Sequence, residues 1–168
     1  ELCDQSLSFD EKIGELIFLV QKSPRELIRL LDIIIREYDA KYFSVADRRP
    51  LSASDFEDGI DSYVRNVVWT IYNRRYLSEI LRLGRTELTN KDVQAVFRIG
   101  DQSARNRIRN WVMSGAVRLS GTTASEGEGG GKPANVYSVF DPRIVRMMDK
   151  RLYDADALVV EAPVGEDE

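Results

Sequence analysis

Apolar residues recur every three or four positions through most of this chain, which is the spacing of amphipathic helices. In residues 9–20 the apolar positions follow this spacing and Ser8 can cap the first turn, so a helix is predicted there. A second helix is predicted from Pro24 to residue 38, because proline at the first helical position needs no N–H partner and Ser23 can cap the free amides. These two helices are expected to pack on each other through their apolar faces.

The next predicted elements are also helical. Residues 39–53 are predicted to form a loop, and Ser52 or Ser54 can cap a helix that runs on to residue 72. Gly59 lowers the helix propensity of that segment by about 1 kcal/mol relative to alanine. A helix from Arg74 to Leu83 should end at Gly84, and the pattern leaves open whether residues 63–83 form one helix or two.

From residue 87 onward the pattern changes to the order of a winged helix-turn-helix. A short strand at Glu87-Leu88 precedes a helix capped by Thr89, a turn at Gly100 and a second helix over residues 102–114. Two alternating segments at residues 116–119 and 135–140 predict a β-hairpin, and the Gly-rich residues 120–133 between them predict its wing. A last helix is predicted from Pro142, with Leu152 as its final apolar position.

The helix over residues 102–114 carries the strongest candidate for binding. One stripe is expected to face the core: Ala104, Ile108, Trp111, Val112 and Gly115. The opposite face carries Arg, Asn and Gln, whose donors and acceptors match guanine and adenine edges in the major groove of DNA. The candidate DNA contacts are Gln102, Ser103, Arg105, Asn106 and Arg109 on the helix, with Arg118 and Lys132 at the wing. The alternative is that this fold serves protein contacts.

The charges are segregated along the chain, although the net charge of its 168 residues is only −4. Residues 1–72 carry a net −5, residues 73–152 a net +7 and residues 153–168 a net −6, and these three segments are the predicted domain organisation. Clustered cations attract a phosphate backbone whatever the overall charge, so double-stranded DNA is the expected partner of the middle segment. The alternative is that the charges only solvate the surface.

Several kinds of chemistry are excluded by composition. The chain has no histidine and one cysteine, Cys3, so it lacks the usual zinc ligands and the base of a Ser-His or Cys-His pair. The stretch from Gly127 to Lys132 is not a phosphate loop, because Glu126 and Pro133 stand where glycine and a hydroxyl residue are needed. We therefore expect no catalytic residue, metal or cofactor in the chain itself, no membrane span and a cytoplasmic location.

The stretch Ser23-Pro24-Arg25-Glu26-Leu27-Ile28, followed by a polar loop and by residues 51–63, resembles the helical lid of AAA+ and STAND-type P-loop ATPases. In that family a winged helix commonly follows the lid. The resemblance implies that Arg25 is a nucleotide-sensing arginine for ATP held by a P-loop core of the same polypeptide. It also implies that this chain is a C-terminal fragment.

The sequence thus predicts a mainly α protein in which a helical lid-like segment leads into a winged helix-turn-helix with a small β-hairpin wing. Its expected function is that of a non-catalytic, regulatory and DNA-binding part of a P-loop ATPase. The alternative is a protein-protein interaction or self-association module, which would form a homo-oligomer. A free-standing transcription regulator is a third possibility.

Overall fold

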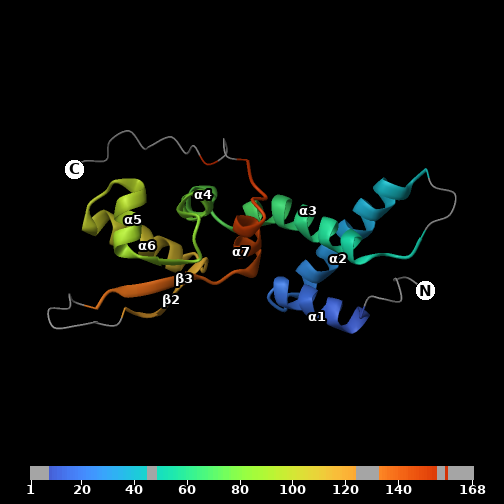
Figure 1. The fold of residues 1–168 in the computed structure, drawn as a ribbon, viewed down its shortest axis with the longest axis horizontal. Coiled ribbons are helices and arrows are strands. Elements are labelled where there is room, and N and C mark those ends of the chain that lie inside the picture. Colours follow the sequence, from blue (N-terminus) through green and yellow to red (C-terminus); the bar gives the residue numbers. More distant parts are fainter. Residues whose placement is uncertain (1–7, 45–48, 124–132, 155–157, 159–168) are drawn as a thin grey trace. The chain divides into compact units, whose positions relative to one another are not determined.

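The computed structural model describes residues 8–44, 49–123, 133–154 and 158 (Figure 1). It is mainly helical with a small three-stranded antiparallel sheet, as the sequence predicted at that level of detail. The chain divides into two compact units, residues 1–68 (unit 1) and residues 69–168 (unit 2). Over the described ranges, every helix is too short or too polar to cross a membrane.

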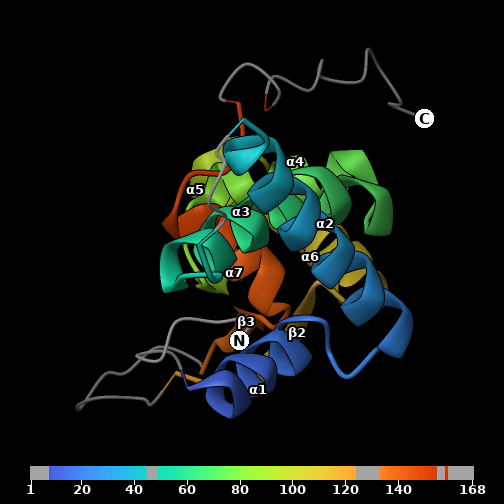
Figure 2. The same cartoon turned by 90° about the vertical axis from the view of Figure 1, so that its right-hand side faces the viewer.

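Unit 1 is built from α1 (Phe9–Leu19), α2 (Pro24–Tyr42) and most of α3 (Ala53–Ile71). The predicted caps are confirmed, because the Ser8 and Ser23 side chains accept hydrogen bonds from backbone amides in the first turns of α1 and α2. The short connection between these two helices can be followed in Figure 2. Their buried side chains include Leu16, Leu30 and Ile34.

The helix α2 is longer than predicted, since residues 39–42 belong to it and not to a loop. Its last turn is held by side chains that periodicity alone does not reveal. The rings of Tyr38 and Tyr42 lie 4.9 Å apart, and the Tyr42 hydroxyl donates to the Asp55 carboxylate at 3.3 Å. These contacts extend the helix toward the start of α3.

Asp55 is the buried polar centre at this end of unit 1, with 2% of its surface exposed. Its carboxylate accepts hydrogen bonds from the Ser52 amide at 2.9 Å, from the Ser52 hydroxyl at 2.5 Å and from Lys41 Nζ at 3.3 Å. Burial opposes the charged form, but the Ser52 and Lys41 hydrogen bonds and the Arg49 charge outweigh it and lower the pKa of Asp55. The carboxylate therefore ties the loop before α3 to the end of α2.

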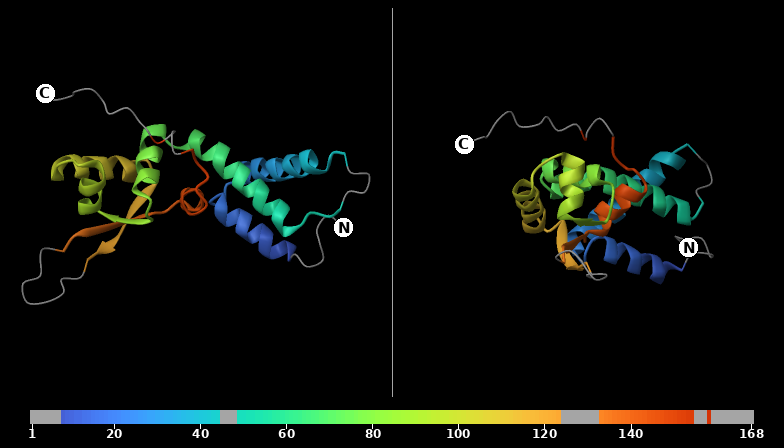
Figure 3. Two further views of the ribbon diagram at one scale, coloured as in Figure 1. Left: turned by 45° about the horizontal axis from the view of Figure 1, so that its top comes forward. Right: turned by 60° about the vertical axis from the view of Figure 1, so that its left-hand side comes forward.

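The helices α2 and α3 lie side by side (Figure 3), and their backbones approach each other closely at Gly59. A Cβ atom placed on Gly59 would lie 2.5 Å from Ile34 Cγ1 and 2.7 Å from Ile34 Cα. The residue that weakened the prediction of α3 is thus the one that allows the two backbones to approach.

Unit 2 begins with the end of α3 and continues with α4 (Arg74–Leu83). The open question about residues 63–83 is settled in favour of two helices, because the Asn73 side chain caps α4 by accepting a hydrogen bond from the Arg75 amide at 3.0 Å. As predicted, α4 ends at Gly84, which has the left-handed φ of 64°.

The remaining elements of unit 2 are, in chain order, β1 (Glu87–Thr89), α5 (Asn90–Phe97), α6 (Asp101–Met113), β2 (Val117–Thr122), β3 (Asn135–Val139) and α7 (Pro142–Asp149). The strands form one antiparallel sheet in the order β1-β3-β2. Figure 1 shows α5 and α6 next to each other, beside this sheet.

Three boundaries in unit 2 differ from the predictions. The turn between α5 and α6 is made by Arg98, whose φ is 53°, while Gly100 is the N-cap of α6. The strand β2 continues to Thr122 with a bulge between Leu119 and Gly121, so the first residues of the predicted wing lie in the sheet. The helix α7 ends at Asp149, and Leu152 is buried beyond it.

A buried polar cluster anchors the start of α7. Asp141 is fully buried and accepts hydrogen bonds from the Tyr72 hydroxyl and from Arg143 Nη2, each at 2.5 Å. Burial first, and then the bond to Asp141, raises the pKa of Tyr72 above its ordinary value. The cluster thus links the segment before α4 to the segment that follows β3.

Candidate functional site

The helix α6 separates a buried stripe from an exposed polar face. Ala104, Ile108 and Trp111 are buried, as predicted. The predicted DNA-contacting residues of this helix are all exposed: Gln102, Ser103, Arg105, Asn106 and Arg109.

The C-terminal end of the predicted core stripe is wrong. Val112 is 38% exposed and Gly115 is exposed as well, so the stripe ends at Trp111. Gly115 adopts a φ of 77° and turns the chain out of the helix, which moves the last position off the core face.

The orientation of α6 is fixed by Glu79, a buried carboxylate on α4. It accepts a hydrogen bond from the Trp111 indole N–H at 3.0 Å in the interior of unit 2. The same carboxylate pairs with Arg107 at 3.4 Å and with Arg75 at 3.3 Å. Since Arg107 also lies over the Phe97 ring at 4.4 Å, this arginine is a structural residue. The remaining cations of α6, Arg105 and Arg109, face outward.

The neighbouring helix α5 begins with a capping box formed by Thr89 and Asp92. The Thr89 hydroxyl accepts from the Asp92 amide, and the Asp92 carboxylate accepts from the Thr89 amide at 2.7 Å. Burial opposes the charge on Asp92, but the Thr89 hydrogen bonds and the ion pair with Arg85 at 2.6 Å lower its pKa. The box fixes the first turn of α5, where Asn90 and Lys91 lie.

A groove of about 680 Å³ runs between α5, α6 and the start of β3. It is lined by Asn90, Lys91 and Gln94 of α5, by Asp101, Arg105, Ile108, Arg109, Val112 and Met113 of α6, and by Pro133, Ala134, Asn135 and Tyr137. We call it the α5-α6-β3 groove. The described lining carries three cations and one carboxylate, which gives this part of the groove a positive charge. Its lining is apolar around Val112, Met113 and Pro133.

An ion pair and a hydrogen bond, each between residues one helical turn apart, order the exposed face of α6. Arg105 Nε lies 2.9 Å from Asp101 Oδ2, and Gln102 Nε2 donates to Asn106 Oδ1 at 3.1 Å. Exposed pairs of this kind contribute only about 0.3–0.5 kcal/mol each. Arg109 has no hydrogen-bond or ion-pair partner within the part of the chain that the structure describes. Its guanidinium is therefore available to a ligand.

Of the five predicted contacts on α6, Arg105 and Arg109 line this groove, whereas Gln102, Ser103 and Asn106 are exposed on the helix outside its lining. Arg118 is exposed on β2, and its guanidinium lies 3.8 Å from the centre of the Phe140 ring. Lys132 lies outside the described residues. Arg25 is exposed in the first turn of α2, in unit 1, and its nucleotide-sensing role remains a prediction.

The structure adds groove residues that the sequence analysis missed. Lys91, Asn90 and Gln94 come from α5, which was predicted only as the helix before the turn. Asn135 and Tyr137 come from β3, where the alternation predicted the two faces of the strand without showing which helix one of them meets. The spacing of Asn90 and Gln94, one helical turn apart, was the available signal for a shared face.

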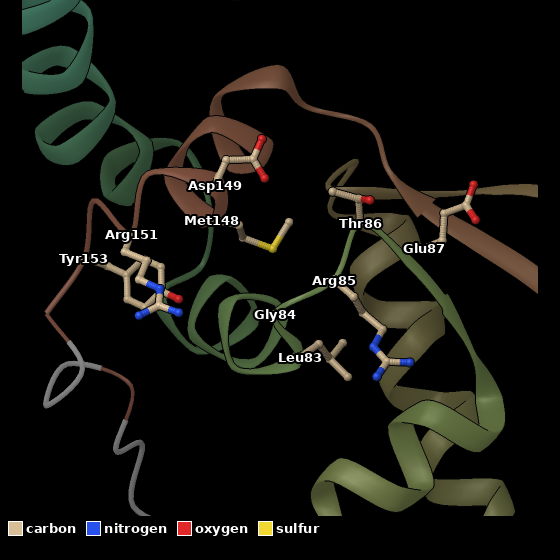
Figure 4. Close-up of a pocket in the computed structure, with 9 residues that line it drawn as sticks. All are labelled: Leu83, Gly84, Arg85, Thr86, Glu87, Met148, Asp149, Arg151 and Tyr153. Carbon is tan, nitrogen blue, oxygen red and sulfur yellow. The ribbon is translucent and has the colours of Figure 1, made fainter.

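A second pocket of about 850 Å³ lies between the loop after α4 and the end of α7 (Figure 4). Arg85 and Arg151 are balanced there by Glu87 and Asp149, and Arg85 is already paired with Asp92. No group of at least three His, Cys, Asp or Glu side chains gathers as a metal site among the described residues. The lining of this pocket thus favours no particular class of ligand.

Comparison with models of protein families, with curated proteins and with solved structures finds no match for this chain.

Proposed function

We propose that unit 2 is a winged helix-turn-helix module that binds double-stranded DNA through α6 and the α5-α6-β3 groove. The observation that carries the proposal is the position of Arg105 and Arg109, which are exposed on one face of α6 and line a groove that also contains Lys91. The order of α4, β1, α5, α6 and a β-hairpin is the order expected of such a module.

The shape and chemistry of this surface suit a duplex. An exposed helix can enter the major groove, while cations on both sides of it meet the phosphates of the two strands. Lys91 on α5 and Arg105 and Arg109 on α6 supply such cations from two helices. Gln102 and Asn106 supply amides that can pair with adenine.

The negative total charge of the chain does not oppose DNA binding at this groove. The local charge along α5 and α6 decides phosphate attraction, because exposed charges more than about 10 Å apart are largely screened at 0.1 M salt. Among the described residues that line the groove, Asp101 is the one carboxylate, and it is paired with Arg105.

The test is titration of labelled duplex DNA at two salt concentrations with the full chain and with an Arg105→Ala/Arg109→Ala variant. We expect the affinity of the variant to fall about 10- to 100-fold, as for the loss of one or two good contacts. The dependence of log affinity on log salt should become shallower by about 1.8, because two phosphate contacts release fewer counterions.

A matched control is Arg25→Ala/Arg29→Ala, which removes two exposed arginines from α2 in unit 1. This variant has the same total charge as the groove variant, so a general charge effect would weaken both equally. Equal binding by the two variants, or binding that ignores salt, would contradict the proposal.

A second candidate function is protein binding, and three exposed apolar side chains favour it. Met113 at the end of α6 is 79% exposed, Leu119 on β2 is 57% exposed and Val112 is 38% exposed. Large apolar side chains that are exposed to water are typical of interaction surfaces when they form a patch, as the neighbouring Val112 and Met113 can at the end of α6. If the partner is a second copy, sedimentation velocity will show a mass that rises with concentration, and Met113→Ser/Leu119→Ser will suppress it.

A further inference from the structure

We propose that the α5-α6-β3 groove binds residues 159–168 of the same chain, and that this segment competes with DNA for α6. The groove combines an apolar part with a basic border, and the segment combines an apolar half with an acidic half. The docking is an inference about the protein alone, whereas the competition rests on the proposed function.

The groove offers two kinds of contact at once. Its apolar lining includes Val112 and Met113, which are 38% and 79% exposed. Its cations are Lys91, Arg105 and Arg109. A phosphate backbone uses the cations but leaves the apolar lining in water, so the best ligand of the whole groove carries both carboxylates and aliphatic side chains.

The segment Val159-Val160-Glu161-Ala162-Pro163-Val164-Gly165-Glu166-Asp167-Glu168 has this composition. It contains three valines, four carboxylate side chains and no cation. Carboxylates form charge-assisted hydrogen bonds with arginine, often in the bidentate geometry that phosphate also uses. The segment can therefore occupy the same cations as DNA while its valines cover the apolar lining.

When it is extended, the segment is about as long as unit 2 is wide. Ten residues extend to about 33 Å. A compact unit of about 100 residues has a radius of gyration of about 13 Å, so it spans on the order of 30 Å. Because the segment belongs to the chain that carries the groove, its effective concentration is in the millimolar range, and a weak contact suffices for occupancy.

The docking is tested in the full chain without DNA by NMR, through the paramagnetic relaxation enhancement that a nitroxide on the segment causes at amides near it. A nitroxide is attached to the thiol introduced by Ala162→Cys, in a Cys3→Ser background so that only one thiol is present. We expect broadening of the amide signals of Arg109, Val112 and Met113. The broadening should be lost when the four acidic residues of the segment are changed to their amides, and also in Arg105→Ala/Arg109→Ala.

Absence of broadening at these amides, or broadening that persists in both charge variants, overturns the docking. A mixture of isotope-labelled chain without nitroxide and unlabelled chain with nitroxide shows whether the docked segment comes from the same chain or from a second copy. Broadening in that mixture means that a second copy supplies the segment, which overturns the same-chain inference.

The competition is tested by DNA titration of the chain whose four acidic residues are changed to amides. If the segment occupies the groove 90% of the time, its removal raises the apparent affinity about tenfold. Broadening without any DNA binding supports the docking and refutes the DNA proposal. DNA binding without broadening refutes the docking alone.

Discussion

Gly59 illustrates at the residue scale how one position can be unfavourable for a helix and necessary for its packing. Within α3, glycine lowers helix propensity by about 1 kcal/mol relative to alanine. In unit 1, however, a Cβ atom there would lie 2.7 Å from the Ile34 Cα, which is backbone and cannot turn aside. The close approach of α2 and α3 decides in favour of glycine.

We predict that Gly59→Ala destabilises the protein by about 1–3 kcal/mol, the usual effect of overpacking. The matched control is Gly14→Ala in α1, because a Cβ atom at Gly14 would meet no other atom within 4 Å. That change should stabilise the protein by about 0.5–1 kcal/mol through helix propensity. Urea unfolding followed by circular dichroism measures both. Equal changes in the two variants would show that packing at Gly59 does not matter.

Asp55 leads to a prediction about pH. Its folded pKa is lower than its ordinary value of 3.8, so its stabilising effect is complete above the ordinary value and is lost as the pH falls through the folded pKa. Asp55→Asn should lower stability at neutral pH and flatten the loss of stability on acidification. The free energy of unfolding of each variant is measured at neutral pH and again at a pH below the ordinary pKa of an aspartate. Asp32→Asn, at an exposed position of α2, serves as control and should keep the acid slope.

At the scale of single elements, the helix starts were well determined by local sequence. Ser8, Ser23 and Thr89 each cap the helix predicted from them, because a cap depends on residues within one turn. Helix ends were less predictable. The helix α2 extends to Tyr42, whose hydroxyl contacts Asp55, and the predicted core stripe of α6 ends before Gly115, where the chain turns out of the helix. Both depend on residues outside the periodic pattern.

The placement of α6 is likewise decided by a residue on another element. Glu79 is 7% exposed and joins α4 to α6 through Trp111, Arg107 and Arg75. The sequence identified Trp111 as a core residue, but a tryptophan in a stripe does not reveal which acceptor its N–H will find. The outward direction of Arg105 and Arg109 follows from this anchoring.

We predict that Glu79→Gln destabilises unit 2 by about 1.5–3 kcal/mol, the range for hydrogen bonds that involve a charged group. DNA affinity should also fall in the scheme proposed above, although Glu79 is too buried to touch a ligand. Thermal unfolding and DNA titration measure the two effects. Glu87→Gln on β1 removes the same charge from an exposed position and should change stability by less than about 0.5 kcal/mol. A similar loss in both variants would argue against a specific role of Glu79.

At the scale of the whole molecule, charge is segregated along the chain into an acidic, a basic and a second acidic segment. Residues 73–152 carry a net +7, between segments of net −5 and −6. The basic segment contains α5 and α6, so a protein with an acidic isoelectric point still presents cations along one groove. This arrangement connects the proposed DNA binding with the proposed competition by residues 159–168, since both use the same cations.

The sequence by itself determined the mainly helical class, the order of the elements and most helix starts. It also indicated which face of α6 is polar, because these properties depend on side-chain periodicity and on contacts within a few residues. Tertiary structure alone decided the α5-α6-β3 groove, which joins residues 90–94, 101–113 and 133–137. It also decided the anchoring of Trp111 by Glu79 and the need for glycine at position 59. Each of these depends on atoms brought together from distant parts of the chain, and local periodicity carries no information about such distances.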